Sequence, residues 1–268
     1  MRLKRFVPAS LQPAARSLYH ALFRTRLRAE WWLRDRLERS PAGLAVPPAA
    51  LRFRVGEDSR LSTFLEVGQR TADNITAVLH QVGFEFAAGQ SVLDFGCGCG
   101  RTLQWLIGRL PQVRWHGVDV DADAIEWCRG NLADGEFTRG SAMPPLPFAD
   151  ATFDLIYAIS VFTHLNEAFQ RAWIAELERV LKPGGILLLS VYSKSVWRLQ
   201  PEAGAVEAGE FVFRKSDKLK GILPEWYHTA LQSRERFTSL LAGQFSRLSY
   251  QERALGDHDA VIAWKANE

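Results

Sequence analysis

Cysteine, long apolar runs and an excess of one charge are all scarce in this chain. Three cysteines in 268 residues, two of them in one glycine-rich loop, make neither a disulfide framework nor a zinc site. No apolar run is long enough to span a bilayer, and the N-terminus lacks the apolar stretch and cleavage site of a secretory signal. The formal net charge of +3 does not by itself indicate a nucleic-acid binder. These absences predict a cytoplasmic protein with reduced thiols.

The first segment of the chain differs in composition from the remainder. Residues 11–37 have helical periodicity, and a proline-rich stretch over residues 40–48 separates them from the rest of the chain. Trp31 and Trp32 stand beside arginines, a composition that suits a membrane surface or an acidic partner. The alternative is that this helix packs on its own domain or on a partner subunit. Basic residues outnumber acidic ones in this segment: Arg16, Arg24, Arg26, Arg28, Arg34, Arg36 and Arg39 against Glu30, Asp35 and Glu38.

A glycine loop comes directly after the first predicted buried strand. Residues 92–95 are mostly apolar, Gly96, Gly98 and Gly100 then alternate with other residues, and a helical pattern covers residues 102–110. Glycine tolerates positive φ and lets a ligand approach the backbone closely. Arg101 occupies a position that the dinucleotide fingerprint gives to glycine, and no Gly-Lys-Ser/Thr comes after it, so two common nucleotide loops are disfavoured.

A carboxylate stands at the end of the second predicted strand, over residues 113–120. Asp119 closes the apolar run, where a carboxylate can accept hydrogen bonds from the two hydroxyls of a ribose. Asp121 stands where the N-cap of the next helix is expected. The glycine loop and Asp119 together predict a nucleoside-binding α/β fold.

Three further motifs occur in order along the chain: Thr-Arg-Gly-Ser-Ala over residues 138–142, Leu-Pro-Phe with Phe-Asp over residues 146–154, and Leu-Lys-Pro-Gly-Gly over residues 181–185. Together with the glycine loop, this arrangement resembles the class I S-adenosylmethionine-dependent methyltransferases. The resemblance implies a Rossmann-like, seven-stranded, mostly parallel sheet with an antiparallel terminal strand, helices on both faces and an N-terminal helical arm. It implies a division into an arm and linker over residues 1–50 and a methyltransferase domain over residues 51–268, with a substrate-region insertion over about 193–243.

The resemblance also implies the residues that hold S-adenosylmethionine. Ser141 departs from the family pattern, since many members have an aspartate there that bonds the adenine amino group. The implied cofactor-binding residues are Asp94, Phe95, Gly96, Cys97, Gly98, Gly100, Asp119, Val120, Ser141, Ala142, Met143, Ala158 and Ile159.

Candidate catalytic residues lie beyond the fourth strand of the methyltransferase pattern, which begins with Phe153 and Asp154. Methyl transfer to oxygen or nitrogen is helped by a base near the donor methyl, and His164 stands just past that strand. Its alternative role is structural, as a cap or a core side chain. Tyr227 and His228 are further candidates for acceptor binding. The Asn-Pro-Pro-Tyr run of amide and adenine N-methyltransferases is missing, which favours oxygen, and no His/carboxylate spacing suggests a metal.

The sequence therefore predicts transfer of a methyl group to a hydroxyl of a small-molecule or glycan-like acceptor. One alternative is a degenerate methyltransferase fold that binds a partner or the inner membrane surface through its basic arm, but Gly96, Gly98, Gly100 and Asp119 are all intact. An RNA methyltransferase is a second alternative, disfavoured because the arm is short and no nucleic-acid module is appended. A nicotinamide-dependent oxidoreductase is disfavoured by the glycine register.

Overall fold

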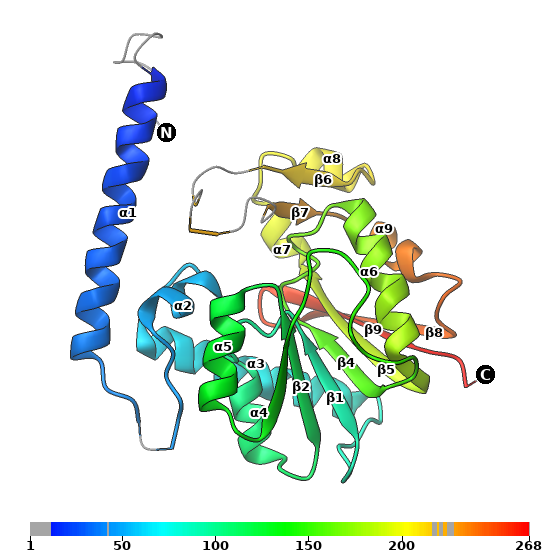
Figure 1. The fold of residues 1–268 in the computed structure, drawn as a ribbon. Helices are drawn as coiled ribbons and strands as arrows, with labels where there is room; N and C mark the ends of the chain where they lie inside the picture. The colour runs from blue at the N-terminus through cyan, green and yellow to red at the C-terminus, as the bar shows by residue number, and fades with distance from the viewer. Residues whose placement is uncertain (1–11, 42, 216–218, 220–221, 224–227, 268) are drawn as a thin grey trace.

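A computed structural model describes residues 12–41, 43–215, 219, 222–223 and 228–267 of the chain (Figure 1). The helices are α1 (Gln12–Leu37), α2 (Ala49–Arg54), α3 (Leu61–Gln81), α4 (Leu103–Arg109), α5 (Ala122–Asn131), α6 (Glu167–Val180), α7 (Lys194–Trp197), α8 (Ala203–Glu207) and α9 (Arg234–Leu241). The strands are β1 (Ser91–Phe95), β2 (Arg114–Asp119), β3 (Gly135–Arg139), β4 (Phe153–Ala158), β5 (Leu181–Tyr192), β6 (Val212–Arg214), β7 (Thr229–Leu231), β8 (Arg247–Leu255) and β9 (His258–Trp264).

Seven strands form one sheet in the order β3-β2-β1-β4-β5-β9-β8. The strands from β3 to β5 are all parallel, whereas β9 runs antiparallel to both β5 and β8. This is the predicted Rossmann-like sheet, including the antiparallel strand near its edge. From β1 the chain builds outward first through β2 and β3 and then, on the other side, through β4 and β5. The order reverses at β1, and α/β folds of this kind bind ligands at that point, beyond the carboxyl ends of the strands.

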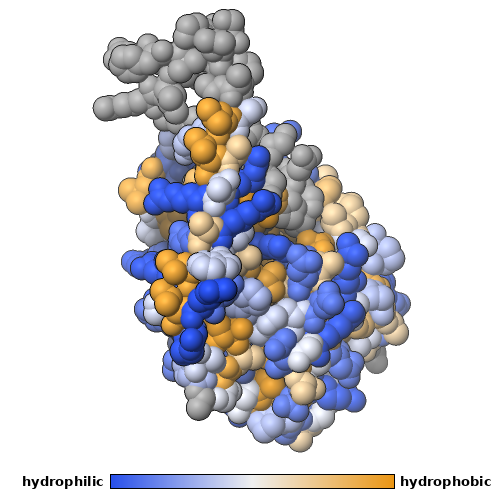
Figure 2. All heavy atoms as spheres, turned by 60° about the vertical axis from the view of Figure 1, so that its left-hand side comes forward, coloured by the Kyte–Doolittle hydropathy of each residue, from blue (hydrophilic) through white to orange (hydrophobic). Residues whose placement is uncertain are grey.

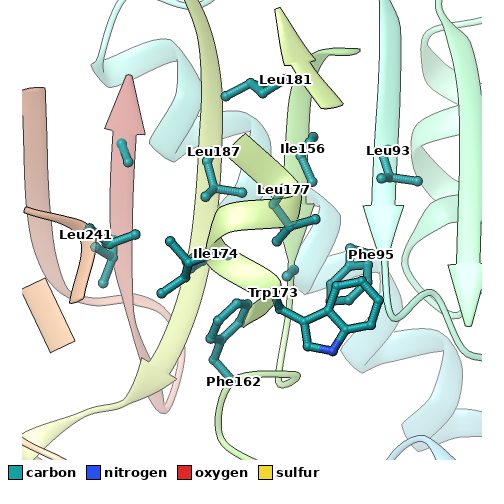
Figure 3. Close-up of a cluster of buried hydrophobic side chains, with 14 of the residues drawn as sticks. Leu93, Phe95, Ile156, Phe162, Trp173, Ile174, Leu177, Leu181, Leu187 and Leu241 are labelled. Carbon is teal, nitrogen blue, oxygen red and sulfur yellow. The ribbon is translucent and has the colours of Figure 1, made fainter. Parts of the chain in front are cut away.

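Helices cover both faces of the sheet. Because successive strand residues point to opposite faces, Leu93 packs with α6 and α9, while its neighbour Val92 packs with α3, α4 and α5. Figure 3 shows the first of these layers, where Trp173, Ile174 and Leu177 of α6 lie against side chains of the sheet. Every residue of β1 is buried, as expected for a central parallel strand covered on both sides.

The strand β5 begins at Leu181, ahead of the Lys-Pro-Gly-Gly turn. Leu181 pairs with Phe153, and the register then shifts before Leu155 pairs with Ile186. The predicted substrate-region insertion is not one separate unit. Within residues 193–243, α9 packs its buried Phe237 into the main core beside α6, whereas β6 and β7 form a separate two-stranded sheet.

The predicted arm is a helix, α1, that lies beside the body of the protein (Figure 1). One side of α1 packs on the body through Leu27 and Trp31, and the ring of Trp31 lies 5.4 Å from that of Phe53 in α2. The arm therefore packs on its own domain along one face. Over the described residues, none of the helices has both the length and the apolar character required to cross a membrane.

Candidate active site

A cavity of about 190 Å³ opens at the carboxyl ends of β1, β2 and β4. Its walls include the glycine loop after β1, Asp119 at the end of β2 and residues 159–161 after β4. This is the position that the reversal of strand order predicts. Three segments far apart in the sequence therefore line one cavity because parallel strands end at the same edge of the sheet.

The glycine loop has no room for side chains at two positions. Gly96 has φ +83°, and a Cβ there would lie 2.3 Å from Cγ2 of Val161. Gly98 has φ +52°, and a Cβ there would lie 2.5 Å from Cγ1 of Val55. Both conformations are in the left-handed region, which favours glycine. The loop thus presents bare backbone to the cavity, as a close-fitting nucleoside ligand requires.

Gly100 has a different role from the other two glycines. Its φ is +71°, and a Cβ there would lie 2.5 Å from Cδ1 of Leu132, so this glycine is required by the packing of the loop on the segment after α5. Gly100 does not line the cavity.

Asp119 organises the floor of the cavity. Its Oδ2 accepts a hydrogen bond of 2.8 Å from the backbone N–H of Gly98, and its Oδ1 accepts one of 2.8 Å from that of Asp121. Burial raises the pKa of Asp119, and these N–H donors act in the opposite direction by stabilising the anion. Each carboxylate oxygen can accept a second hydrogen bond. Asp119 therefore both holds the glycine loop and can accept bonds from the vicinal hydroxyls of a ribose.

Asp94 is a second carboxylate in the cavity wall. It lies at the end of β1, and its Oδ2 accepts a hydrogen bond of 3.0 Å from the hydroxyl of the buried Tyr157 in β4. Burial raises the pKa of Asp94 to about 7, and the bond from Tyr157 counteracts this only in part. The charge of the cavity therefore changes near neutral pH.

We expect the affinity for a cationic ligand in this cavity to rise with pH until Asp94 is ionised. Below about pH 7, such a ligand must displace the proton of Asp94, so its affinity should fall by up to about tenfold per pH unit. Above pH 7 the affinity should be nearly constant. Calorimetric titration with S-adenosylmethionine from pH 5.5 to 8.5, in two buffers of different ionisation enthalpy, measures both the affinity and the protons released.

Two variants make this pH test specific. Asp94→Asn should abolish the pH dependence, because the amide does not titrate. Tyr157→Phe should move the dependence to higher pH, because it removes the hydrogen bond that lowers the pKa of Asp94. A dependence that persists unchanged in Asp94→Asn would assign it to another group.

His164 lies in the wall of the same cavity, just beyond β4. Its Nδ1 is 2.7 Å from the carbonyl oxygen of His228. Because a carbonyl only accepts hydrogen bonds, Nδ1 carries the proton and Nε2 is the basic nitrogen of the neutral ring. Burial lowers the pKa of His164 to about 4, so the ring is neutral at pH 7. The histidine is thus fixed in one tautomer with a basic nitrogen.

The turn after α2 closes one side of the cavity, which the sequence did not indicate. Arg54 donates from one guanidinium nitrogen to both carboxylate oxygens of Asp121, at 2.8 Å each, and Val55 lies against Gly98. The side chain of Asp121 also caps α5, as predicted, by accepting bonds from the backbone N–H groups of Asp123 and Ala124. No local pattern signals that residues 54–55 meet α5, since 67 residues separate Arg54 from Asp121.

Trp173 of α6 lines the side of the cavity formed by Ser141 and Ala142. The indole N–H of Trp173 donates to the carbonyl of Ala142 at 3.2 Å, and Trp173, Ser141 and Ala142 all line the cavity. This bond fixes the loop that the sequence assigned to the adenine side. Trp173 itself was not a sequence-based candidate, because its spacing in α6 is that of a core residue.

Most of the predicted site residues meet in this one cavity: Asp94, Phe95, Gly96, Cys97, Gly98, Asp119, Val120, Ser141, Ala142, Ile159 and His164. Ala158 does not line it, because alternation along β4 turns its side chain into the core under α6. Met143 does not line it either, and its side chain is exposed. His228 contributes its backbone carbonyl to His164, while its ring stands edge-on to Phe213 at 5.3 Å. Tyr227 lies outside the described residues.

The chain is similar to known methyltransferases in sequence and in fold. Residues 92–185 match the family model described as a methyltransferase domain. The phthiotriol/phenolphthiotriol dimycocerosates methyltransferase 1 of Mycobacterium ulcerans is 32% identical over 143 residues, which cover 52% of each protein. The fatty-acid O-methyltransferase of Mycolicibacterium smegmatis is 36% identical over 102 residues, which cover 37% of this chain and 36% of that protein. The chain thus spans about half or less of the length of these two relatives.

A solved structure of a SAM-dependent methyltransferase from Methanosarcina mazei has the same fold, with a TM-score of 0.54 and 21% identity, over 71% of this chain and 98% of that one. The sheet order, the glycine loop and the carboxylate after β2 define a nucleoside-binding α/β protein. Within that class, residues 92–185 belong to a methyltransferase domain, the segment that the family model matches. The methyl donor that the family implies is S-adenosylmethionine, and the bare glycine backbone beside Asp119 fits its nucleoside.

Proposed function

We propose that this protein is an O-methyltransferase that transfers the methyl group of S-adenosylmethionine to a hydroxyl of a small, largely apolar acceptor. The observation that carries this proposal is the neutral His164 in the wall of the cavity that contains the glycine loop and Asp119. A protonated acceptor oxygen needs a hydrogen-bond acceptor beside it, and a neutral imidazole with a defined basic nitrogen suits that role.

The residues of the cavity divide into two groups by their proposed roles. Asp119 accepts hydrogen bonds from the ribose, the backbone at Gly96 and Gly98 lies against the donor, and Asp94 balances its positive charge. S-adenosylmethionine, when bound, supplies an electrophilic methyl group on a sulfonium whose departure needs no proton. His164 orients the acceptor hydroxyl and takes its proton. With a pKa of about 4 it is a weak base, so it accepts the proton only while the new oxygen–carbon bond forms.

Apolar side chains around the cavity favour an acceptor with an apolar body. Val55, Val161, Leu165 and Leu223 line it, and such surfaces bind apolar groups by removing them from water. The names of two relatives, a fatty-acid O-methyltransferase and a dimycocerosates methyltransferase, refer to lipid-like molecules. We therefore place a hydroxylated lipid or polyketide ahead of the glycan-like acceptor that the sequence also allowed.

Two measurements test this proposal. Calorimetric titration should show micromolar binding of S-adenosylmethionine and S-adenosylhomocysteine and no binding of NAD. Production of S-adenosylhomocysteine should then be assayed with a long-chain alcohol, the amine of the same chain length and a monosaccharide. Turnover of the alcohol alone supports the proposal, whereas turnover of the amine or the sugar contradicts the proposed acceptor. No binding of either sulfur nucleoside would instead favour a degenerate module.

A further inference from the structure

The helix α1 exposes an apolar surface on the side that faces away from the body. Leu18, Leu22, Trp32 and Leu33 are 61%, 62%, 57% and 49% exposed, respectively, and together they form what we call the outer stripe. At 100° per residue, these four side chains fall within an arc of about 100°, opposite the Leu27 that packs on the body. Figure 2 shows hydrophobic and hydrophilic residues interleaved along this helix.

The acidic residues of this region contact the body. In α1, Glu30 accepts a bond from Ser59 and Asp35 accepts the backbone N–H of Ala49, and Glu38, which comes directly after the helix, pairs with Arg52. The charge within the arc of the outer stripe is positive, since Arg36 lies there and Arg28 lies beside it. Both arginines are exposed and form no ion pair within the part of the chain that the structure describes. An apolar stripe flanked by unpaired cations is complementary to an anionic, amphipathic surface.

Trp32 and Arg36 are arranged as at a lipid interface. The guanidinium carbon of Arg36 lies 4.1 Å from the centre of the Trp32 ring, so the aromatic and the cation occupy the same place on the helix. Tryptophan is enriched at the level of lipid headgroups because its ring is apolar and its N–H is polar, and arginine pairs with headgroup phosphates.

The inner side of α1 connects this surface to the cavity. Leu27 of α1 packs in one cluster with Phe53 and Leu223, and Leu223 also lines the cavity. The residues on which α1 packs are therefore continuous with the cavity wall.

We propose that the outer stripe of α1 binds the surface of an anionic lipid bilayer, with the helix lying in the plane of the headgroups. A second copy of the chain fits less well, because a symmetric contact through the stripe would bury Arg36 of each copy with no acidic side chain in the stripe to pair with it. Nucleic acid fits less well too, because a phosphate backbone requires the arginines and not four exposed apolar side chains.

Flotation of the full-length protein with vesicles tests this proposal. We expect the protein to bind vesicles of phosphatidylcholine with phosphatidylglycerol at least about tenfold more tightly than pure phosphatidylcholine vesicles, and added salt should weaken the binding. Leu22→Glu/Leu33→Glu and Arg28→Glu/Arg36→Glu should each lower the affinity for anionic vesicles by about tenfold or more. Affinity for S-adenosylmethionine should be unchanged in both variants, which shows that they are folded and keeps this test separate from that of the methyl transfer.

Matched control variants place the same changes elsewhere on the surface. Leu199→Glu alters a leucine that is 84% exposed, and Arg70→Glu/Arg114→Glu reverses two exposed arginines outside α1. Both controls should bind anionic vesicles like the unchanged protein. Equal binding to neutral and anionic vesicles, no binding to either, or equal losses in the α1 and control variants would overturn the proposal. So would a dimer, seen by light scattering, that only the α1 variants disrupt.

Discussion

Replacing Asp119 by alanine is expected to lower the affinity for S-adenosylmethionine by about 100-fold or more. The variant would lose the two charge-assisted hydrogen bonds that we propose between Asp119 and the ribose. Each such bond is worth about 1.5–3 kcal/mol, and about 1.4 kcal/mol corresponds to a factor of ten. It also leaves the N–H groups of Gly98 and Asp121 without their carboxylate, so the glycine loop loses its support. Calorimetric titration with S-adenosylmethionine and S-adenosylhomocysteine measures the effect, and both ligands should weaken alike because they share the ribose.

Asp123→Asn is the matched control for this prediction. Asp123 stands two residues after the N-cap of α5 and also contacts Arg54, but it does not line the cavity. Its replacement should change the affinity by less than about threefold, as for exposed ion pairs in general. An Asp119→Ala protein that binds the donor as tightly as the unchanged protein would show that Asp119 serves the loop alone.

Replacing His164 by alanine is expected to slow methyl transfer by about 100- to 10,000-fold, the usual contribution of a positioned acid–base group. Because His164 is assigned to the acceptor, the affinity for S-adenosylmethionine should change by less than about threefold. The combination of a large fall in kcat with an unchanged donor affinity distinguishes this role from a structural one. The proper readout is single-turnover formation of methylated product with the alcohol identified in the acceptor screen.

The pH profile of the reaction gives a second test of His164. The neutral ring is the active form, and burial lowers its pKa to about 4, so activity should fall on this account only as the pH drops through about 4 and not near 6.5. His116→Gln is the control, because His116 packs against Phe153 away from the cavity. Full activity in His164→Ala, or equal losses in both variants, would return His164 to a structural role.

The fold could be predicted to a large extent from local patterns. Residues 92–95 are mostly apolar because β1 is covered on both faces, and the three glycines mark the place where the chain leaves the sheet. Asp121 was recognised as an N-cap because that role depends only on neighbouring residues at the start of the helix. Such features depend on contacts close in sequence, so a single sequence contains them.

The site was predictable where it lies at the end of a strand and not where distant elements meet. Gly96, Gly98 and Asp119 stood out at the ends of the first two strands and Asp94 was implied by the resemblance, and all four line the cavity. Val55 and Trp173 were missed, because one comes from the turn after α2 and the other from a helix whose pattern indicates only core. Ala158 and Met143 were included by family resemblance, but neither lines the cavity. The side chain of Ala158 points into the core because residues alternate along β4, and the side chain of Met143 is exposed to solvent. The roles proposed for the lining residues stay predictions.

By itself, the sequence determined the glycine loop and the carboxylate at the end of β2, because periodicity and turn chemistry are local properties, and its ordered motifs gave the resemblance to the class I methyltransferases. Only the tertiary structure decided which tautomer His164 adopts, how the pKa of Asp94 reaches about 7, and that Arg54 closes the cavity on Asp121. It also decided that Glu30 and Asp35 of α1 contact the body while Leu18, Leu22 and Leu33 are exposed. These properties depend on burial and on partners far away in the chain, and only the folded arrangement of the sheet and helices brings those partners together.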